Sequence, residues 1–491
     1  MFTLKIGCSI IIWNIPLLAY AQVGTQSPLS VPERDLSSVV RPTIVDKVQR
    51  SQAQSFKEFR DSTEVIPINQ ARAGIRSDIT EQELEKAKSD VSNFYKNLDV
   101  VATIQLPVPN SKDVISYDCV PEKGQPANKD LIEAGGADTP PSAPDQTDKI
   151  TNSHGLSVGA AEAVVSNDPK RIRQNLENAA CPINTVPIRR TTIPEVLSIH
   201  REPHPTIDRG ALRDLLGRKS TSPSLSYPHQ HRYAHAIGLH ENHGIMARLN
   251  VWSPKVLEGD MSLSQVWVVG GDPDQGNLQT VEAGWQVMKL WRSPFSALFV
   301  YSTADNYTNT GCYASHCQHN YPIRPESFKL KNNKIILGKP LEQQSSLAGS
   351  QAIVEIAWVR KPETGNWWLR VNDQWVGYYP KSFFKSGPLS IQGDYVDFGG
   401  EATGSTPTSE MGSGKFPDAG KGHAAFQSRL SYVNADGIAV AATVRPYVTH
   451  EQCYSITVNG PVEPEDNSGT YIYFGGPGIN ARNEVLPRGC R

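Results

Sequence analysis

The sequence has almost no excess of charge of either sign and, beyond its N-terminus, no long hydrophobic run. The formal net charge is -2, so the charge balance does not indicate binding to nucleic acid or to an anionic membrane. No stretch after the N-terminus approaches the ~20 apolar residues that a membrane-spanning helix needs. Only 38% of the residues are hydrophobic, whereas there are 38 glycines and 36 prolines. This composition favours loops and β-structure over a helical bundle.

The apolar run at the N-terminus has the features of a secretory signal. Lys5 precedes an apolar stretch over residues 6–18, and Ala19-Tyr20-Ala21 fits the small-x-small pattern of a cleavage site. We therefore predict that residues 1–21 are a signal peptide and that the protein is secreted. The alternative is a buried N-terminal helix, which the shortness of the run and the polar stretch after it disfavour.

Cysteine is scarce, with seven residues in the chain. Cys8 would leave with the signal peptide, and six would remain. An even number of cysteines in an exported chain favours disulfides over metal ligation or thiol catalysis. Pairing neighbours in sequence predicts the disulfides Cys119–Cys181, Cys312–Cys317 and Cys453–Cys490.

Residues 22–225 are expected to form an upstream region with long linkers. Thr80 and Glu83 fit a capping box, and apolar residues at helical spacing after it predict an amphipathic helix over residues 81–98. Residues 121–170 are rich in Pro, Gly, Asn, Asp and Ser, which predicts a long loop. The basic and polar stretch 212–226 predicts an exposed linker, where proteolytic cutting is plausible.

From about His229 onwards, short runs of β-branched and aromatic residues recur between turn residues, which predicts many short strands. The candidates are 244–252, 264–269, 282–288, 297–301, 352–359, 367–371, 375–379, 395–398, 425–432 and 471–474. No helical pattern of comparable strength appears there. The sequence therefore predicts a mainly β domain over 229–491, either a sandwich or a barrel.

Two glutamates stand in apolar, glycine-rich stretches of this half. Glu282 lies within Thr280–Val287 and Glu401 ends Phe398–Glu401. Glutamate is rarely buried without a reason, and two carboxylates that face each other would share protons and act as an acid/base pair. The alternative for each is an ordinary surface charge paired with Lys or Arg.

Seven motifs of the downstream half, in order, resemble the neprosin family of secreted peptidases. They are Ser262–Gly271, Thr280–Val287, Thr310–Tyr313, Gly365–Trp368, Gly399–Glu401, Met411–Pro417 and Tyr473–Gly478. The resemblance covers essentially all of 229–491. Cys181–Arg190 resembles the activation-peptide domain of the same family, although Asn184 stands where the family typically has Gly.

The resemblance implies a six- or seven-stranded antiparallel β-sandwich as the catalytic domain, with a smaller α+β prodomain before it. It also implies a glutamic endopeptidase that needs no cofactor, cuts proline-containing proteins or peptides after proline, and is made as an inhibited precursor. The prodomain would be the intramolecular inhibitor, and we expect a monomer. The family's two catalytic glutamates fall on Glu282 and Glu401.

Other side chains are candidates for contacting substrate. Gln265, on a neighbouring candidate strand, would donate to an oxyanion if it faces the same side as the glutamates. Trp267, Trp285 and Tyr307 would line a groove with aromatic walls that suit a proline ring. The alternatives are a satisfied core amide for Gln265 and core or sheet-face positions for the aromatic residues.

Five histidines lie close together near the expected junction of the two domains: His229, His231, His235, His240 and His243. No Cys or carboxylate spacing of a known zinc site accompanies them, so we expect no metal. We expect instead that their protonation, as pH falls through ~6.5, loosens the prodomain.

The favoured function is hydrolysis of peptide bonds at acidic pH by water that the glutamate pair activates. No Gly-x-Ser-x-Gly elbow and no catalytic Cys/His context is present. Two carboxylates on a sheet would also suit a retaining glycosidase. A catalytically inactive domain that binds a cell wall or a partner is the other alternative.

Overall fold

The structure is a computed structural model in which all the described residues lie in one compact unit, residues 47–491. It describes residues 58–59, 72, 78–96, 98–107, 114–125, 138–144, 171–173, 180–199, 204–218, 230–257, 259–288, 291, 293–308, 310–314, 328–404, 409–460 and 469–478. The predicted signal peptide, His229, Cys317 and Cys490 lie outside these residues.

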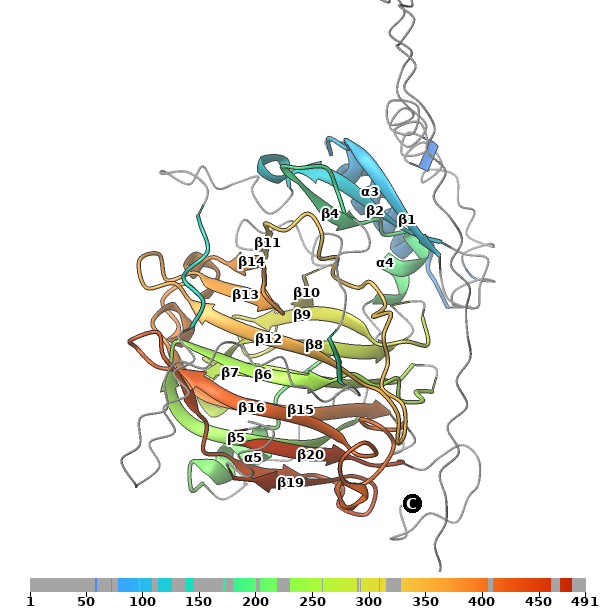
Figure 1. Ribbon diagram of the computed structural model, residues 1–491. Coiled ribbons are helices and arrows are strands. Elements are labelled where there is room, and N and C mark those ends of the chain that lie inside the picture. Colours follow the sequence, from blue (N-terminus) through green and yellow to red (C-terminus); the bar gives the residue numbers. More distant parts are fainter. Residues whose placement is uncertain are drawn as a thin grey trace, which may run out of the picture. The chain divides into compact units, whose positions relative to one another are not determined.

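Two large sheets lie face to face in the downstream half (Figure 1). The first is antiparallel and has seven strands, in the order β10 (Cys312–Tyr313), β9 (Ala297–Thr303), β8 (Gln279–Met288), β7 (Met261–Gly270), β15 (Gly393–Gly404), β5 (Gln230–Asn242) and β18 (Arg445–Val448). This sheet holds both candidate glutamates.

The second sheet has ten strands. Its order is β11 (Lys329–Leu330), β14 (Gln374–Tyr379), β13 (Trp367–Val371), β12 (Gln351–Arg360), β6 (Gly244–Asn250), β16 (Ala425–Val433), β20 (Tyr471–Gly475) and β19 (Ser455–Asn459), with β17 (Ala439–Ala441) paired to β16 and β3 (Arg171–Arg173) paired to β12. The β3–β12 pair is parallel. The mainly β, antiparallel sandwich is therefore confirmed, although this sheet is larger than the resemblance implied.

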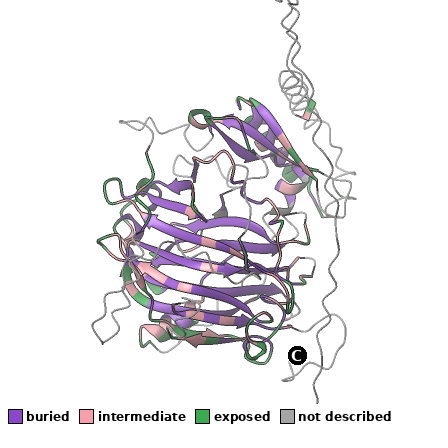
Figure 2. Ribbon diagram, viewed as in Figure 1, coloured by how far each residue is buried: buried purple, intermediate pink, exposed green. Residues whose placement is uncertain are grey.

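Apolar side chains at alternate strand positions fill the space between the sheets. Val266 and Val281 of the first sheet belong to the same buried cluster as Leu249 and Val354 of the second. Both sheets are buried along most of their length in Figure 2. The other face of the seven-stranded sheet carries a separate buried cluster that includes Trp267, so that face is covered too.

The upstream half contains a smaller α+β unit, as expected. Its sheet has the order β1 (Ala102–Pro107), β2 (Val114–Pro121) and β4 (Thr185–Arg189), and its helices are α3 (Glu81–Lys96) and α4 (Ile193–Ile199). The capping box is confirmed, because Thr80 N donates to Glu83 Oε2 at 2.8 Å and Glu83 N donates to Thr80 Oγ1 at 3.2 Å. The predicted helix 81–98 corresponds to α3.

The upstream unit is hydrogen-bonded to the second sheet and to the segment after β11. Gln125 exchanges two hydrogen bonds of 2.9 Å with the backbone of Leu330. Cys181 N donates to Asn333 O at 2.7 Å. Asp138 binds Lys361 Nζ at 2.7 Å, and burial, which raises its pKa, is outweighed by this contact and neighbouring donors that lower it.

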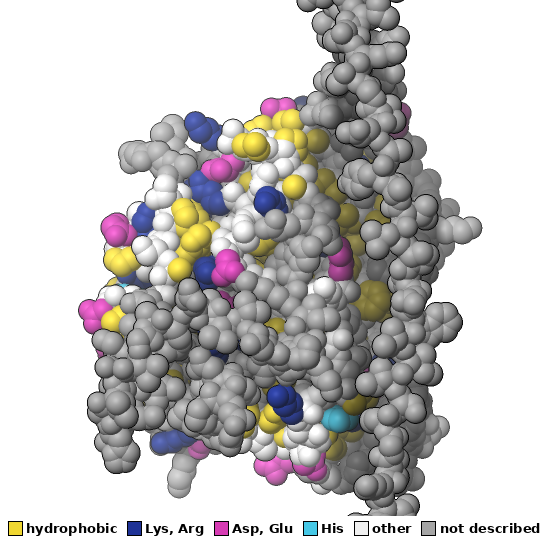
Figure 3. Space-filling model, in the orientation of Figure 1, with side chains coloured by type: hydrophobic (Ala, Val, Ile, Leu, Met, Phe, Trp, Pro, Cys, Tyr) yellow, Lys and Arg dark blue, Asp and Glu magenta, His cyan; other side chains and the backbone are white. Residues whose placement is uncertain are grey.

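Short 3-10 helices complete the elements: η2 (Glu122–Gly124), η4 (Pro273–Gln275), η6 (Lys381–Phe384), η7 (Pro388–Ser390) and η8 (Pro417–Ala419). Within the described ranges, no helix is both long and apolar enough to cross a membrane. On the face drawn in Figure 3, Lys and Arg side chains are interspersed with Asp and Glu.

The Cys119–Cys181 disulfide, the first of the predicted pairs, joins β2 to the segment before β4. Cys453 is also disulfide-bonded, and Cys490, its predicted partner, lies outside the described residues, as does Cys317. The sequence separation of Cys119 and Cys181 is 62. Closing a loop of that length lowers the entropy of the unfolded chain.

We expect replacement of both Cys119 and Cys181 by serine to destabilise the upstream unit by about 4 kcal/mol, because the unfolded chain regains the entropy of the open loop. Denaturant unfolding of the full-length precursor, followed by a probe in the upstream unit, measures this. An unchanged unfolding midpoint would show that the disulfide does not constrain the unfolded state.

All ten candidate strands lie at strands of the structure, but one linker prediction is wrong. Residues predicted as the start of an exposed linker belong to helix α5 (Arg209–Leu215), and Leu212 is fully buried. Asp208 caps the helix by accepting hydrogen bonds from Gly210 N at 2.9 Å and Ala211 N at 3.1 Å. The helix forms because its apolar side chains have a sheet face to pack on.

Candidate active site

Glu282 on β8 and Glu401 on β15 project from the same face of the seven-stranded sheet. Strand β7 lies between them and pairs Trp267 with Glu282 and Leu263 with Glu401. Residues paired across a sheet share a face, and positions of equal parity along a strand do as well. Both glutamate side chains are fully buried, with 0% exposure.

Glu282 accepts two hydrogen bonds through Oε1. Thr280 Oγ1 donates at 2.6 Å and Tyr307 OH at 2.7 Å, while Oε2 has no hydrogen-bond partner among the described residues. Burial raises the pKa of Glu282 to about 8, against the opposing effect of the two hydrogen bonds, and the charge of Glu401 raises it further. The side chain is therefore mostly protonated at neutral pH.

Glu401 also uses one oxygen for its contacts. The backbone N–H of Thr206 donates to Oε1 at 3.3 Å, and His231 Nδ1 is hydrogen-bonded to the same oxygen. Burial raises the pKa of Glu401 well above its ordinary value, although the Thr206 N–H opposes the shift. Its Oε2 has no partner among the described residues.

Gln265 lies on β7 between the register partners of the two glutamates and faces the same side. It is fully buried, and its amide makes no hydrogen bond of standard geometry in the described part of the chain, although it lies close enough to Glu282 to lower the pKa of that carboxyl. An unpaired buried amide is costly, so this position suits a residue that pairs with a substrate carbonyl. Trp267 shares the face and is 1% exposed.

Trp285, predicted to line the same groove, does not lie on this face. It belongs to the core between the sheets, where its Nε1 donates to Asn250 O at 3.0 Å. Side chains of a strand alternate between faces, and positions 282 and 285 differ by an odd number. Glu282 and Trp285 therefore point to opposite faces of β8, and Trp285 cannot contact a substrate that Glu282 contacts.

His235 on β5 lies between two carboxylates on the same face. Its Nδ1 is 2.8 Å from Asp397 Oδ2, and its Nε2 is 3.4 Å from Asp208 Oδ2. Burial lowers the pKa of His235, but the two carboxylates outweigh burial and raise it to about 10. The two carboxylates therefore favour the charged ring, and the expected switch by histidine protonation stays a prediction.

The histidines of the predicted cluster do not converge on one point. His231 contacts Glu401, whereas His240 stacks on Tyr432 at 4.3 Å. No group of three or more potential metal ligands is found among the described residues. The described histidines thus have different partners and do not form one cluster.

Residues 204–218, which we call the cover segment, lie over the face that carries the glutamates. Ile207, Ala211 and Leu212 belong to the same buried cluster as Trp267. Thr206 Oγ1 lies 2.7 Å from Tyr233 OH. The cover segment therefore buries the glutamates and accounts for the cluster on this outer face.

Charged and polar contacts attach the C-terminal part of the cover segment to the loops at the sheet edge. Arg213 Nε donates to both oxygens of Asp274, at 2.8 and 3.0 Å. Arg218 pairs with Asp272, and Arg209 Nη2 donates to Asn306 O at 3.2 Å. Exposed ion pairs such as that of Arg213 contribute little, so apolar burial is the main attachment.

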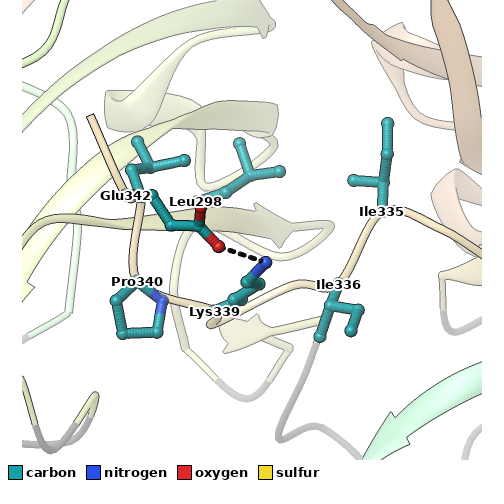
Figure 4. Close-up of a pocket in the computed structure, with 7 residues that line it drawn as sticks. Leu298, Ile335, Ile336, Lys339, Pro340 and Glu342 are labelled. Carbon is teal, nitrogen blue, oxygen red and sulfur yellow. Dashed lines mark hydrogen bonds and ion pairs between the residues drawn. The ribbon is translucent and has the colours of Figure 1, made fainter. Parts of the chain in front are cut away.

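A small cavity lies elsewhere, at the segment after β11, and Figure 4 shows its lining. Leu298, Ile335 and Pro340 line it together with the Lys339–Glu342 ion pair, and its volume is about 10 Å³. This is roughly the space of one water. The cavity is therefore too small to bind a substrate.

The glutamate face can take part in proton transfer without a metal or a nucleophilic side chain. One carboxylate can remove a proton from water while the other donates to a leaving group. Sequence reasoning missed Thr206 and Asp208 as neighbours of the site. The usable signal was Asp208 before the apolar pair Ala211 and Leu212, which fits the N-cap of a packed helix.

Comparison with known proteins gives one family match. Residues 258–477, a range that includes both glutamates, match the family model described as Neprosin, which confirms the resemblance of the sequence motifs. The crystal structure of scytalido-glutamic peptidase with a transition state analog inhibitor is similar with a TM-score of 0.28 and 12% identity, covering 50% of this chain and 98% of that one. At so low a TM-score the likeness says nothing about what this chain does.

Proposed function

Since residues 258–477 form a domain of the neprosin family, we propose that this chain is the precursor of a secreted glutamic endopeptidase. It hydrolyses peptide bonds after proline at acidic pH. Glu282 and Glu401 are its catalytic residues, and the upstream half is its inhibitor. The observation that carries the proposal is the pair of fully buried carboxylates on one sheet face.

The surroundings of the pair support acid/base chemistry. Glu282 and Glu401 each keep one oxygen without a partner among the described residues, and the unpaired amide of Gln265 lies between their strands. A water held by the glutamates would be the nucleophile, and Gln265 would donate to the carbonyl oxygen as it becomes negative. A proline preference is supported by the aromatic rings of Trp267 and Tyr307 on this face.

The cover segment would inhibit the precursor by blocking access to the glutamates. Thr206 and Ile207 occupy the face where a peptide substrate would have to lie, and both are buried. A substrate therefore cannot reach Glu401 until the cover segment moves. The Cys119–Cys181 disulfide agrees with export, because such bonds persist in oxidising compartments.

A substrate panel tests the proposal. The purified precursor is held at about pH 3, below the ordinary aspartate pKa of about 3.9. Its products from a proline-containing peptide, the same peptide with alanine in place of proline, and an oligosaccharide are identified by mass spectrometry. We expect cleavage after proline and none of the oligosaccharide. Glycan hydrolysis alone would instead support the retaining-glycosidase alternative.

Asp208 is the group through which acid can loosen the cover segment. Burial raises its pKa, but the hydrogen bond and charge of His235 and the N–H groups of Ala211 and Gly210 lower it further than burial raises it. The ionised carboxylate therefore stabilises the covered state above its ordinary pKa, and this contribution is lost as pH falls through the lowered value.

The glutamates act in the opposite sense. Burial under the cover segment raises the pKa of Glu282 and Glu401, so their contribution favours the covered state in acid and is lost as pH rises. Aromatic rings complete the surroundings of His235, namely Tyr233, Trp267 and Tyr447. Activation in acid therefore requires the loss of the Asp208 charge to prevail.

We expect Asp208→Asn to raise the pH of half-maximal activation by roughly one unit, since the charge on His235 loses one partner. Asparagine caps a helix as well as aspartate does, so the change isolates the charge. The measurement is peptidase activity after a fixed incubation at each pH. Asp274→Asn is the matched control, because it removes an exposed ion pair of the same segment. Equal activation pH for Asp208→Asn and the unmodified chain would exclude this role.

A further inference from the structure

The N-terminal part of the cover segment runs across the sheet from the side of Glu282. The ring of His204 stacks on Tyr301, with 5.8 Å between centroids and an interplanar angle of 4°. Tyr301 on β9 is the register partner of Glu282 on β8. His204 therefore lies over the strand next to Glu282, on the face that both glutamates share.

Two residues later the chain has reached Glu401. The hydrogen bond of 3.3 Å from Thr206 N to Glu401 Oε1 comes from the amide nitrogen of the Pro205–Thr206 peptide bond. That bond therefore lies between the two glutamates, with proline on its N-terminal side. This is the arrangement of a substrate that is to be cut after proline.

The residues on either side hold the bond in place. Thr206 Oγ1 is 2.7 Å from Tyr233 OH, and Ile207 belongs to the buried cluster on this face. His204 Nδ1 lies 3.2 Å from Pro205 O, so a protonated ring would donate to the carbonyl oxygen that becomes negative during hydrolysis. Glu401 thus contacts the nitrogen of this peptide group, and His204 lies beside its oxygen.

We propose that Pro205–Thr206 is the bond that the precursor cuts in its own chain. The inference rests on the proposed function of the glutamate pair. Glu282 takes a proton from water, and the hydroxide adds to the carbonyl carbon of Pro205. The carbon–nitrogen bond then breaks, and Glu401 gives its proton to the nitrogen of Thr206. The products are a carboxyl group on Pro205 and an amino group on Thr206, with one water consumed.

The cut is intramolecular, because Pro205 and Thr206 are buried within their own chain, where a second molecule cannot reach the bond. The bond survives in the closed precursor since burial keeps Glu282 protonated at neutral pH and excludes the water that the reaction needs. Acid that loosens the Asp208 contact with His235 admits water, which lowers the pKa of Glu282 so that its carboxyl can ionise and act as the base, while the bond stays beside Glu401.

Mapping of chain ends tests the inference. The full-length precursor is brought to about pH 3, below the ordinary aspartate pKa of about 3.9, and the new N- and C-termini are identified by mass spectrometry over time. We expect Thr206 as the first new N-terminus and Pro205 as the first new C-terminus. The rate constant should not change on tenfold dilution, because the reaction occurs within one chain.

Pro205→Ala should slow formation of the Thr206 terminus more than tenfold, whereas Pro223→Ala, a proline change outside the cover segment, should not. Mapping the unmodified chain does not depend on how either variant folds. Peptide hydrolysis that appears while the Pro205–Thr206 bond stays intact overturns the inference and leaves the proposed function standing. Absence of any hydrolysis, including that of the peptide, overturns both.

Discussion

Replacing either Glu282 or Glu401 with glutamine is expected to lower kcat/KM for a proline-containing peptide on the order of 10³-fold. Glutamine has nearly the size of glutamate but cannot take up or release the proton at working pH. The loss follows for both positions because the reaction needs a base for water and an acid for the leaving nitrogen. The two losses should not multiply in the double variant, since the residues act as a unit.

By the proposed mechanism the variants do not activate themselves, so the unmodified chain and all variants are first cut with trypsin, which cleaves after lysine and arginine. Glu355→Gln is the matched control. Glu355 lies on β12 of the other sheet and pairs with Arg248 at 3.0 Å, so its loss should leave kcat/KM unchanged.

Thermal unfolding separates chemistry from folding in the same variants. Burial disfavours the charged form of both glutamates, so a neutral amide of the same size should not lower the unfolding temperature. Loss of activity with stability retained supports the catalytic assignment. Activity within a few-fold of the unmodified enzyme in either variant is incompatible with it.

The strands of the sandwich were predictable because each is a short run of β-branched and aromatic residues between turn residues. Strand β5 was not among the predicted strands, because its histidines were interpreted as a pH-responsive cluster near the junction of the two domains. Of those histidines, His235 is buried against Asp397 of β15, which is 162 residues away in the sequence. A contact over such a sequence distance leaves no local pattern.

The site was predictable in part. Glu282 and Glu401 stood out because charged residues are rare in apolar, glycine-rich strands. Their common face depends on strand register, which the sequence does not show. The position of Trp285 was foreseeable, since strand alternation separates it from Glu282. The cover segment was not, because it looks like a polar linker until its apolar residues meet the sheet.

The activated enzyme is expected to lose activity on the order of 100-fold between its acidic optimum and pH 8. The active form carries one proton on the glutamate pair, because one carboxyl must be a base and the other an acid. As pH rises above the upper pKa of the pair, the acid is lost and the rate falls tenfold per pH unit.

The pKa of Glu282 is expected to fall on activation. In the precursor, burial raises the pKa of Glu282 to about 8, and apolar side chains of the cover segment pack on the face that carries it. Once the segment leaves, solvent reaches the carboxyl, and its pKa falls towards the ordinary range for glutamate. The repulsion between two nearby carboxylates remains and still separates the two protonation steps.

A pH profile of kcat/KM for enzyme freed of the cover segment measures both protonation steps of the pair. We expect a bell-shaped profile whose rising and falling limbs both lie below neutral pH. Tyr307→Phe provides a check on which residue belongs to which limb. It removes a hydrogen bond of 2.7 Å that stabilises ionised Glu282, so the limb that reports Glu282 should move to higher pH. Full activity at pH 8 in the unmodified enzyme would show that the pair is not the acid and base, because both carboxyls are then ionised.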